Sequence, residues 1–162
     1  MKIVIAGTSG KGTIYGTMLK KAGHDVSFVD LWQSNIDKIN RRGLFVNNLG
    51  NEEKTFIKAF LPIHYKEPAE LYILFTDGEQ LDNMLKFSNY AIGEETKVLC
   101  FVEGNDNLEV IKKYVPEGNV VLGKSTMSAE LLEAGKAAVT NYGETEIQNE
   151  EIKKLFAEAG LN

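Results

Sequence analysis

A short apolar run, a turn rich in glycine and an amphipathic helix follow one another at the start of the chain. Residues 3–6 read Ile-Val-Ile-Ala, the continuous apolar pattern of a strand buried on both faces of a sheet. Residues 7–12 read Gly-Thr-Ser-Gly-Lys-Gly, and apolar side chains then recur at three-to-four spacing from Ile14 to Ala22. This order predicts the first half of a βαβ unit with a phosphate-binding turn at residues 7–12.

The turn is close to the dinucleotide-binding fingerprint G-x-G-x-x-G. Gly7 and Gly12 occupy its first and last positions, and Ser9 stands where the second glycine is expected. Ser9 is small, and its hydroxyl can donate to a phosphate. The N–H groups around residues 10–12 and the helix dipole add an anion site, so we predict that a dinucleotide pyrophosphate binds here. The alternative is a glycine-rich turn that only shapes a βα corner. A P-loop is disfavoured because its pattern needs glycine where Ile5 stands.

The rest of the chain continues the alternation of strands and helices. Strands are expected at residues 26–29, 44–46, 56–60, 71–75, 98–102 and 120–122, and helices at residues 33–42, 79–90, 108–114 and 150–159. Beyond Gly123, short strand candidates at residues 126–131, 137–141 and 145–147 are separated by glycines, which suggests antiparallel structure at a sheet edge. We expect an α/β fold with a Rossmann-like, doubly wound, mostly parallel sheet and short antiparallel edge strands near the C-terminus, in one dinucleotide-binding domain over residues 1–162.

Ligands of such sheets bind beyond the carboxyl ends of the strands. Asp30 ends the second strand, where a carboxylate can accept hydrogen bonds from an adenosine ribose and repels a 2′-phosphate, which favours NAD over NADP. The alternative is that Asp30 only caps the next helix. Lys11, Arg41 and Arg42 are the nearest groups to bind a 2′-phosphate. The predicted cofactor-binding residues are Gly7, Thr8, Ser9, Gly10, Lys11, Gly12, Asp30, Leu31, Thr76, Asp77 and Glu103.

Composition and charge argue against several other classes of protein. The chain has 162 residues and a net charge of −5 without a basic stripe, which disfavours binding to nucleic acid. It has no apolar run long enough to span a bilayer and no signal-peptide pattern before its first strand. Its single cysteine, Cys100, lies within a predicted strand, as a buried structural thiol would. We expect a cytoplasmic protein whose partner is a dinucleotide rather than a membrane or a nucleic acid.

Several further segments match one known pattern. They are residues 1–5, Tyr15-Gly16, residues 22–26, 42–46, 121–127, 135–144 and 156–161. Together they resemble the N-terminal domain of ketopantoate reductase (2-dehydropantoate 2-reductase) over nearly the whole chain. Members of that family reduce a 2-keto acid with NADPH, and a helical domain follows the Rossmann domain. The resemblance implies an NAD(P)-binding domain, part of an oxidoreductase acting on a 2-keto or 2-hydroxy acid. Half of a prephenate or 3-hydroxyacid-type dehydrogenase is an alternative, since the opening is similar.

The chain departs from the family pattern at positions tied to catalysis. Aligned on Gln80, Asp77 stands where the family places a lysine. After the next predicted strand, Glu103 stands where the family places an asparagine. Both changes put a carboxylate where an anionic keto acid and its alkoxide need a donor or a cation. Leu31 replaces the basic residue that usually follows the second strand, consistent with NAD. We therefore assign no catalytic residue and no metal ligand, and a non-catalytic dinucleotide-binding or sensing module is the alternative function.

The resemblance also bears on partners. The chain ends about where the helical domain of the family would begin. A Rossmann domain without that half leaves apolar surface exposed, so a homodimer or a helical domain supplied from elsewhere is expected to cover it.

Overall fold

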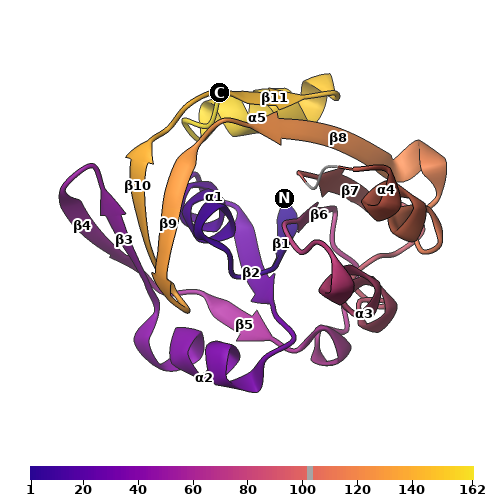
Figure 1. The fold of residues 1–162 in the computed structure, drawn as a ribbon, viewed down its shortest axis with the longest axis horizontal. Coiled ribbons are helices and arrows are strands. Elements are labelled where there is room, and N and C mark those ends of the chain that lie inside the picture. The colour runs from indigo at the N-terminus through magenta and orange to yellow at the C-terminus, as the bar shows by residue number, and fades with distance from the viewer. Residues whose placement is uncertain (102–103) are drawn as a thin grey trace.

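The computed structural model describes residues 1–101 and 104–162, and within them the chain forms a central sheet and a smaller second sheet (Figure 1). The described strands of the central sheet lie in the order β11-β8-β7-β6-β1-β2-β5. In chain order they are β1 (Lys2–Ala6), β2 (Asp25–Val29), β5 (Lys58–Phe60), β6 (Leu71–Leu74), β7 (Lys97–Cys100), β8 (Val120–Ser125) and β11 (Thr145–Ile147).

The central sheet is parallel from β8 to β5, and only β11 runs antiparallel at its edge. The strands proceed outward in both directions from the β1–β6 pair, which is the topological switch point of a doubly wound sheet. Ala6 is in register with Val29 on one side and Leu74 on the other, and Leu74 is in register with Cys100. The predicted fold class is confirmed, and the register brings the segments after β1, β2, β6 and β7 to one edge.

Helices cover both faces of this sheet, because successive residues of β1 point to opposite sides. Ile5 packs with Tyr15 and Phe156 in one apolar cluster, whereas Val4 packs with Leu81 and Ile111 in the other. Burying each such side chain contributes about 1.5–3 kcal/mol. The helices are α1 (Gly10–Lys21), α2 (Gln33–Arg42), α3 (Glu79–Phe87), α4 (Asn105–Lys112) and α5 (Glu150–Glu158), with short 3₁₀ turns η1 (Pro62–His64) and η2 (Glu117–Asn119).

The second sheet differs from the sequence prediction. It consists of β4 (Asn51–Thr55), β3 (Leu44–Asn48), β10 (Lys136–Asn141) and β9 (Ser128–Glu133), in that order. The expectation that the late strands form an antiparallel edge of the main sheet holds for β11 alone, because β10 pairs in parallel with β3 and antiparallel with β9. The sequence did not predict β4, whose five residues are polar and lack an apolar alternation.

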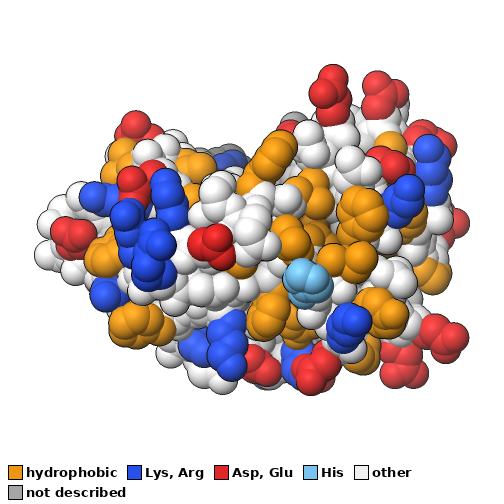
Figure 2. Space-filling view, turned by 90° about the horizontal axis from the view of Figure 1, so that it is seen from below, with side chains coloured by type: hydrophobic (Ala, Val, Ile, Leu, Met, Phe, Trp, Pro, Cys, Tyr) orange, Lys and Arg blue, Asp and Glu red, His pale blue; other side chains and the backbone are white. Residues whose placement is uncertain are grey.

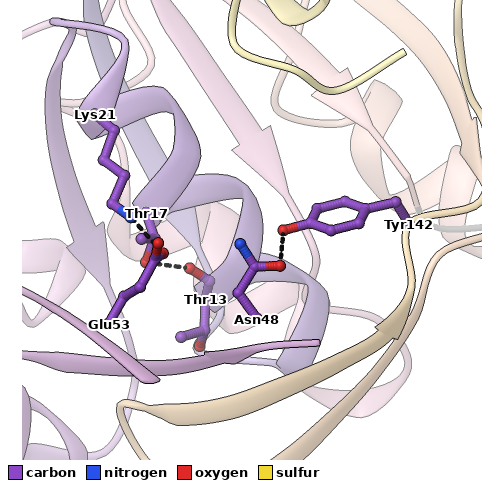
Figure 3. Close-up of polar contacts among 6 residues, drawn as sticks. All are labelled: Thr13, Thr17, Lys21, Asn48, Glu53 and Tyr142. Carbon is purple, nitrogen blue, oxygen red and sulfur yellow. Dashed lines mark hydrogen bonds and ion pairs between the residues drawn. The ribbon is translucent and has the colours of Figure 1, made fainter. Parts of the chain in front are cut away.

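The second sheet packs against α1 through an apolar layer with polar contacts at its margin (Figure 3). Lys21 of α1 forms an ion pair with Glu53 of β4. The Tyr142 hydroxyl donates to Asn48 Oδ1 at 2.6 Å, which ties the end of β10 to the end of β3. Because α1 also carries the glycine turn at its N-terminus, this sheet supports the element that presents the turn.

Element boundaries also differ in places from those predicted. Helix α3 ends at Phe87, whereas the sequence predicts a helix over residues 79–90. Ser88 there contacts Tyr72 through their hydroxyls at 2.7 Å, a tertiary contact that the helical periodicity does not reveal. Helix α4 spans Asn105–Lys112 instead of residues 108–114. No helix of the described stretches is long and apolar enough to cross a membrane.

Candidate functional site

The glycine turn is built as the fingerprint requires. Gly7 has a φ of +104°, a conformation that L side chains rarely adopt, and its N–H donates to the Val29 carbonyl at 3.0 Å. A Cβ on Gly12 would lie 2.6 Å from the Gly7 carbonyl oxygen, so helix and turn approach closely only because position 12 is glycine. The sequence thus places α1 with its N-terminus directly at the carboxyl end of β1.

Ser9 fills the middle position of the fingerprint as a helix cap. Its Oγ accepts a hydrogen bond from the Gly12 N–H at 3.0 Å, and its carbonyl accepts one from the Thr13 N–H at 2.9 Å. The Ser9 hydroxyl keeps its own proton for donation. The N–H groups of Gly10 and Lys11 lie in the first turn of α1 and have no acceptor within the helix. These groups fit an anionic phosphate.

Asp30 is nearly buried, with 5% of its surface exposed. The Thr8 hydroxyl donates to its Oδ2 at 2.6 Å, and the Trp32 N–H donates to its Oδ1 at 2.8 Å. The Asn35 side chain adds a longer contact to Oδ1 at 3.3 Å. The carboxylate therefore shapes the β2–α2 turn, while the N-cap position of α2 is Trp32 rather than Asp30. It retains acceptor capacity beside the glycine turn, and Leu31 follows it half-buried.

The segment after β6 lies on the other side of the glycine turn. The Thr76 hydroxyl donates to the Ala6 carbonyl at 3.3 Å, and Thr76 Oγ1 would lie 2.8 Å from a Cβ on Gly7. Asp77 is exposed and reaches the edge of a cavity next to the turn. The prediction for Glu103 lies outside the described residues.

This cavity has a volume of about 540 Å³. The Phe75 and Phe101 rings that line it are stacked, with centroids 5.2 Å apart and planes 11° apart. Lys11 reaches the opposite wall, where its Nζ donates to the Ser125 carbonyl at 3.0 Å. The cavity is lined by Ser9, Gly10, Lys11, Phe75, Asp77, Phe101, Ser125 and Ala129. It therefore combines an apolar surface, a cation and the helix N-terminus at the carboxyl edge of the sheet.

Sequence reasoning missed a hydroxyl cluster beneath this cavity. The Tyr15 hydroxyl donates to Ser125 Oγ at 2.6 Å and lies 2.7 Å from Thr145 Oγ1. Burial raises the pKa of Tyr15, so the phenol stays neutral. Tyr15 lies within the amphipathic helix that the sequence predicts, and no local pattern indicates that β8 and β11 bring two hydroxyls to it. Only the tertiary fold joins these three elements.

A larger depression of about 650 Å³ lies at the opposite edge of the sheet. Its lining includes Met1, Glu70 and Lys97, which lie at or before the amino ends of β1, β6 and β7. Ligands of open parallel sheets bind at the carboxyl ends, so the cavity beside the glycine turn is the better candidate. Within the described stretches, no group of three or more His, Cys, Asp or Glu side chains is arranged to hold a metal ion.

Comparison with known proteins adds evidence on the family. The family model described as ketopantoate reductase PanE/ApbA matches residues 3–151. The chain belongs to the ketopantoate reductase family. It is 38% identical to the 2-dehydropantoate 2-reductase of Lactococcus lactis and 33% identical to that of Streptococcus pyogenes, with 100% of the chain and 55% of each relative covered. The family match decides against the prephenate-type alternative raised by the opening residues.

A solved structure also matches the whole chain. A ternary structure of D-mandelate dehydrogenase with NADH and anilino(oxo)acetate superposes with a TM-score of 0.94 at 31% identity, over 100% of this chain and 55% of that chain. The chain therefore spans about half the length of the ketopantoate reductases it matches, and it corresponds to their NAD(P)-binding Rossmann domain.

Proposed function

We propose that this chain binds a nicotinamide adenine dinucleotide at the glycine turn, and that it prefers NAD(H) to NADP(H). The observation that carries the proposal is Asp30, a nearly buried carboxylate held beside the glycine turn by Thr8 at 2.6 Å. A ribose 2′-hydroxyl can donate to such a carboxylate, whereas a 2′-phosphate would bring two negative charges against it. The pyrophosphate would lie on the N–H groups of Gly10 and Lys11.

The basic residues that would compensate for a 2′-phosphate lie elsewhere. Arg41 is eight residues beyond the start of α2, which corresponds to about 12 Å along the helix axis. Arg42 pairs with Glu133 of β9 at 3.1 Å. Lys11 is directed to Ser125. Among the described residues near Asp30, these positions leave its negative charge unbalanced by a nearby cation, which supports the preference for NAD(H).

Calorimetric titration with NADH and with NADPH tests this proposal. We expect tighter binding of NADH, and we expect Asp30→Asn to reduce the preference about tenfold, because the variant loses the charge but keeps one acceptor oxygen. Asp37→Asn on the exposed face of α2 is the matched control and should leave the preference unchanged. Tighter binding of NADPH by the unmodified chain would contradict the proposal, as would binding of neither dinucleotide.

We further propose that the chain is the nucleotide-binding part of an oxidoreductase acting on a 2-keto or 2-hydroxy acid. The support comes from its relatives, named 2-dehydropantoate 2-reductase and D-mandelate dehydrogenase. The dinucleotide would supply hydride transfer, and this chain would bind and orient it. Groups that bind the keto acid would come from a helical domain or a partner chain. Turnover of 2-dehydropantoate, followed by NADH absorbance with and without such a domain, tests this.

One observation favours a second candidate, a dinucleotide-binding or sensing module without catalysis. Asp77 presents an exposed carboxylate at the edge of the cavity, where an anionic keto acid would be repelled. This candidate predicts dinucleotide binding without turnover even when a helical domain is supplied. It also predicts that Asp77→Lys increases the affinity of the binary complex for anilino(oxo)acetate, with Asp77→Asn giving a smaller increase.

Exposed apolar side chains support a partner for this domain. Figure 2 shows hydrophobic side chains gathered on the half of this face that carries α3, while Lys and Arg side chains gather on the other half. Ile63 and Tyr90 are each 49% exposed, and Phe87 is 39% exposed. We propose that a second copy or a helical domain covers part of this surface. A monomer at all concentrations in light scattering would contradict the homodimer.

A cytoplasmic location is proposed from the single buried thiol of Cys100.

A further inference from the structure

Lys11 is the one basic side chain that lines the cavity beside the glycine turn, among the residues that the structure describes. It lies in the first turn of α1 and is half-buried. Its Nζ donates to the Ser125 carbonyl at 3.0 Å, at the end of β8. The side chain therefore extends from α1 across the cavity wall toward β8.

Ser125, whose carbonyl accepts from Lys11, is itself held in place by hydrogen bonds to its side chain. Ser125 Oγ accepts from the Tyr15 hydroxyl at 2.6 Å and from the Met127 N–H at 3.3 Å. Tyr15 is fully buried and packs against Phe75 and Phe101 with ring centroids 5.6 and 5.3 Å away. The positive charge of Lys11 is thus fixed by a packed framework instead of moving freely in solvent, and its effect on a ligand is screened less than that of an exposed lysine.

The position of the cavity identifies the half of the dinucleotide that would enter it. A dinucleotide binds across the switch point of a doubly wound sheet, with one nucleotide on each side. Asp30, after β2, marks the adenosine side. The cavity lies on the other side, where Phe75 follows β6, Phe101 follows β7 and Ser125 ends β8. It would therefore hold the nicotinamide half, against the two stacked phenylalanine rings.

The two redox forms of the nicotinamide differ in charge at this place. The oxidised ring carries a positive charge and the reduced ring is neutral, while the pyrophosphate is the same in both forms. We propose that the Lys11 ammonium group makes this site bind the reduced dinucleotide more tightly than the oxidised one. This inference rests on the proposed dinucleotide binding and adds a redox preference to it.

A carboxylate in the same cavity acts in the opposite direction. Asp77 would favour the oxidised ring, but its side chain is exposed at the cavity edge. Water and salt screen an exposed charge more effectively than a half-buried one held by a hydrogen bond. Lys11 therefore outweighs Asp77, and the net preference is for the reduced form.

The test is the ratio of the dissociation constants for NAD⁺ and NADH, measured by calorimetry on the whole chain. Lys11→Met removes the charge and keeps a side chain of similar shape, Lys11→Arg keeps the charge, and Lys20→Met removes an exposed charge from the same helix. We expect the ratio to exceed one in the unmodified chain. We expect it to fall about tenfold in Lys11→Met, equal to about 1.4 kcal/mol, and to stay unchanged in the other two variants.

The outcomes separate this inference from the proposed function. If both dissociation constants rise equally in Lys11→Met, the ammonium group binds the pyrophosphate and the redox preference is overturned. If neither changes, Lys11 has no role in binding, which also overturns it, while the proposed dinucleotide binding stands. If the unmodified chain binds neither form, both proposals fail. Lys11→Arg, which retains the charge, and melting curves of all variants exclude misfolding as the cause of a changed ratio.

Discussion

The Thr8 hydroxyl donates a hydrogen bond to the Asp30 carboxylate at 2.6 Å, and so joins the glycine turn after β1 to the end of β2. Both side chains are buried, with 7% and 5% of their surfaces exposed. The contact connects the residue type expected to bind a ribose with the turn expected to bind the pyrophosphate. The stability of the turn and the position of the ribose acceptor therefore depend on the same hydrogen bond.

Replacing Thr8 by valine tests this relationship. The variant removes the donor and leaves Asp30 Oδ2 without that partner in a buried position, so we expect the free energy of unfolding to fall by about 1–3 kcal/mol. NADH affinity should fall as well. Chemical denaturation and calorimetry measure the two effects. Thr8→Ser keeps the hydroxyl and is the control, and an equal loss in Thr8→Ser would show that packing, not the hydrogen bond, is responsible.

Gly12→Ala should disrupt the turn more than its small size suggests. The added Cβ would lie 2.6 Å from the Gly7 carbonyl oxygen, a backbone atom that moves only if the turn moves. We expect a loss of about 2 kcal/mol or more in unfolding free energy and loss of NADH binding. Gly118→Ala, where nothing lies within 4 Å of the added atom, should stay within about 1 kcal/mol of the unmodified chain. Retained binding in Gly12→Ala would place the dinucleotide elsewhere.

Tyr15→Phe should show whether the Tyr15 hydroxyl supports the cavity or only the stability of the fold. It removes the hydrogen bond to Ser125, whose carbonyl holds Lys11, and we expect destabilisation by about 1–2 kcal/mol together with weaker NADH binding. Tyr72→Phe removes a buried contact with Ser88 on the other face of the sheet and should destabilise the fold by a similar amount without changing affinity. Equal affinity in both variants would show that the hydroxyl cluster does not support binding.

The Cys100 thiol should make stability depend on pH in alkaline solution. Burial raises its pKa from 9.0 to about 12, so the folded chain keeps this proton after the unfolded chain has lost it. The contribution is complete below about pH 9 and decreases as pH rises toward 12, with a slope of up to about 1.4 kcal/mol per pH unit.

Urea denaturation between about pH 8 and 10.5 measures this effect in the unmodified chain and in Cys100→Ala. The variant should show a shallower decline, because it lacks the part of the pH dependence that the buried thiol contributes. The native thiol should also resist alkylation until the protein unfolds. Parallel pH profiles of the two proteins, or rapid alkylation of the native protein, would contradict the prediction.

The local sequence was sufficient for the central sheet and for the glycine turn. Continuous apolar runs predict β1, β6 and β7 because strands buried on both faces need apolar residues at every position. Gly7 and Gly12 predict the turn because neither position accepts a side chain. Gly7 has a positive φ, and a Cβ on Gly12 would contact the Gly7 carbonyl oxygen. The same reasoning did not predict β4, since an exposed strand of polar residues stays in place through its partner β3 rather than through its own pattern.

The sequence by itself determined that strands and helices alternate, that a glycine turn joins β1 to α1, and that Asp30 follows β2. These features depend on neighbours in the chain, on periodicity and on backbone conformation. Only the tertiary structure decided that β9 and β10 join β3 and β4 in a second sheet, and that Lys11 reaches Ser125 across 114 positions of the chain. Contacts of that kind depend on how distant elements pack, and no local pattern of residues encodes them.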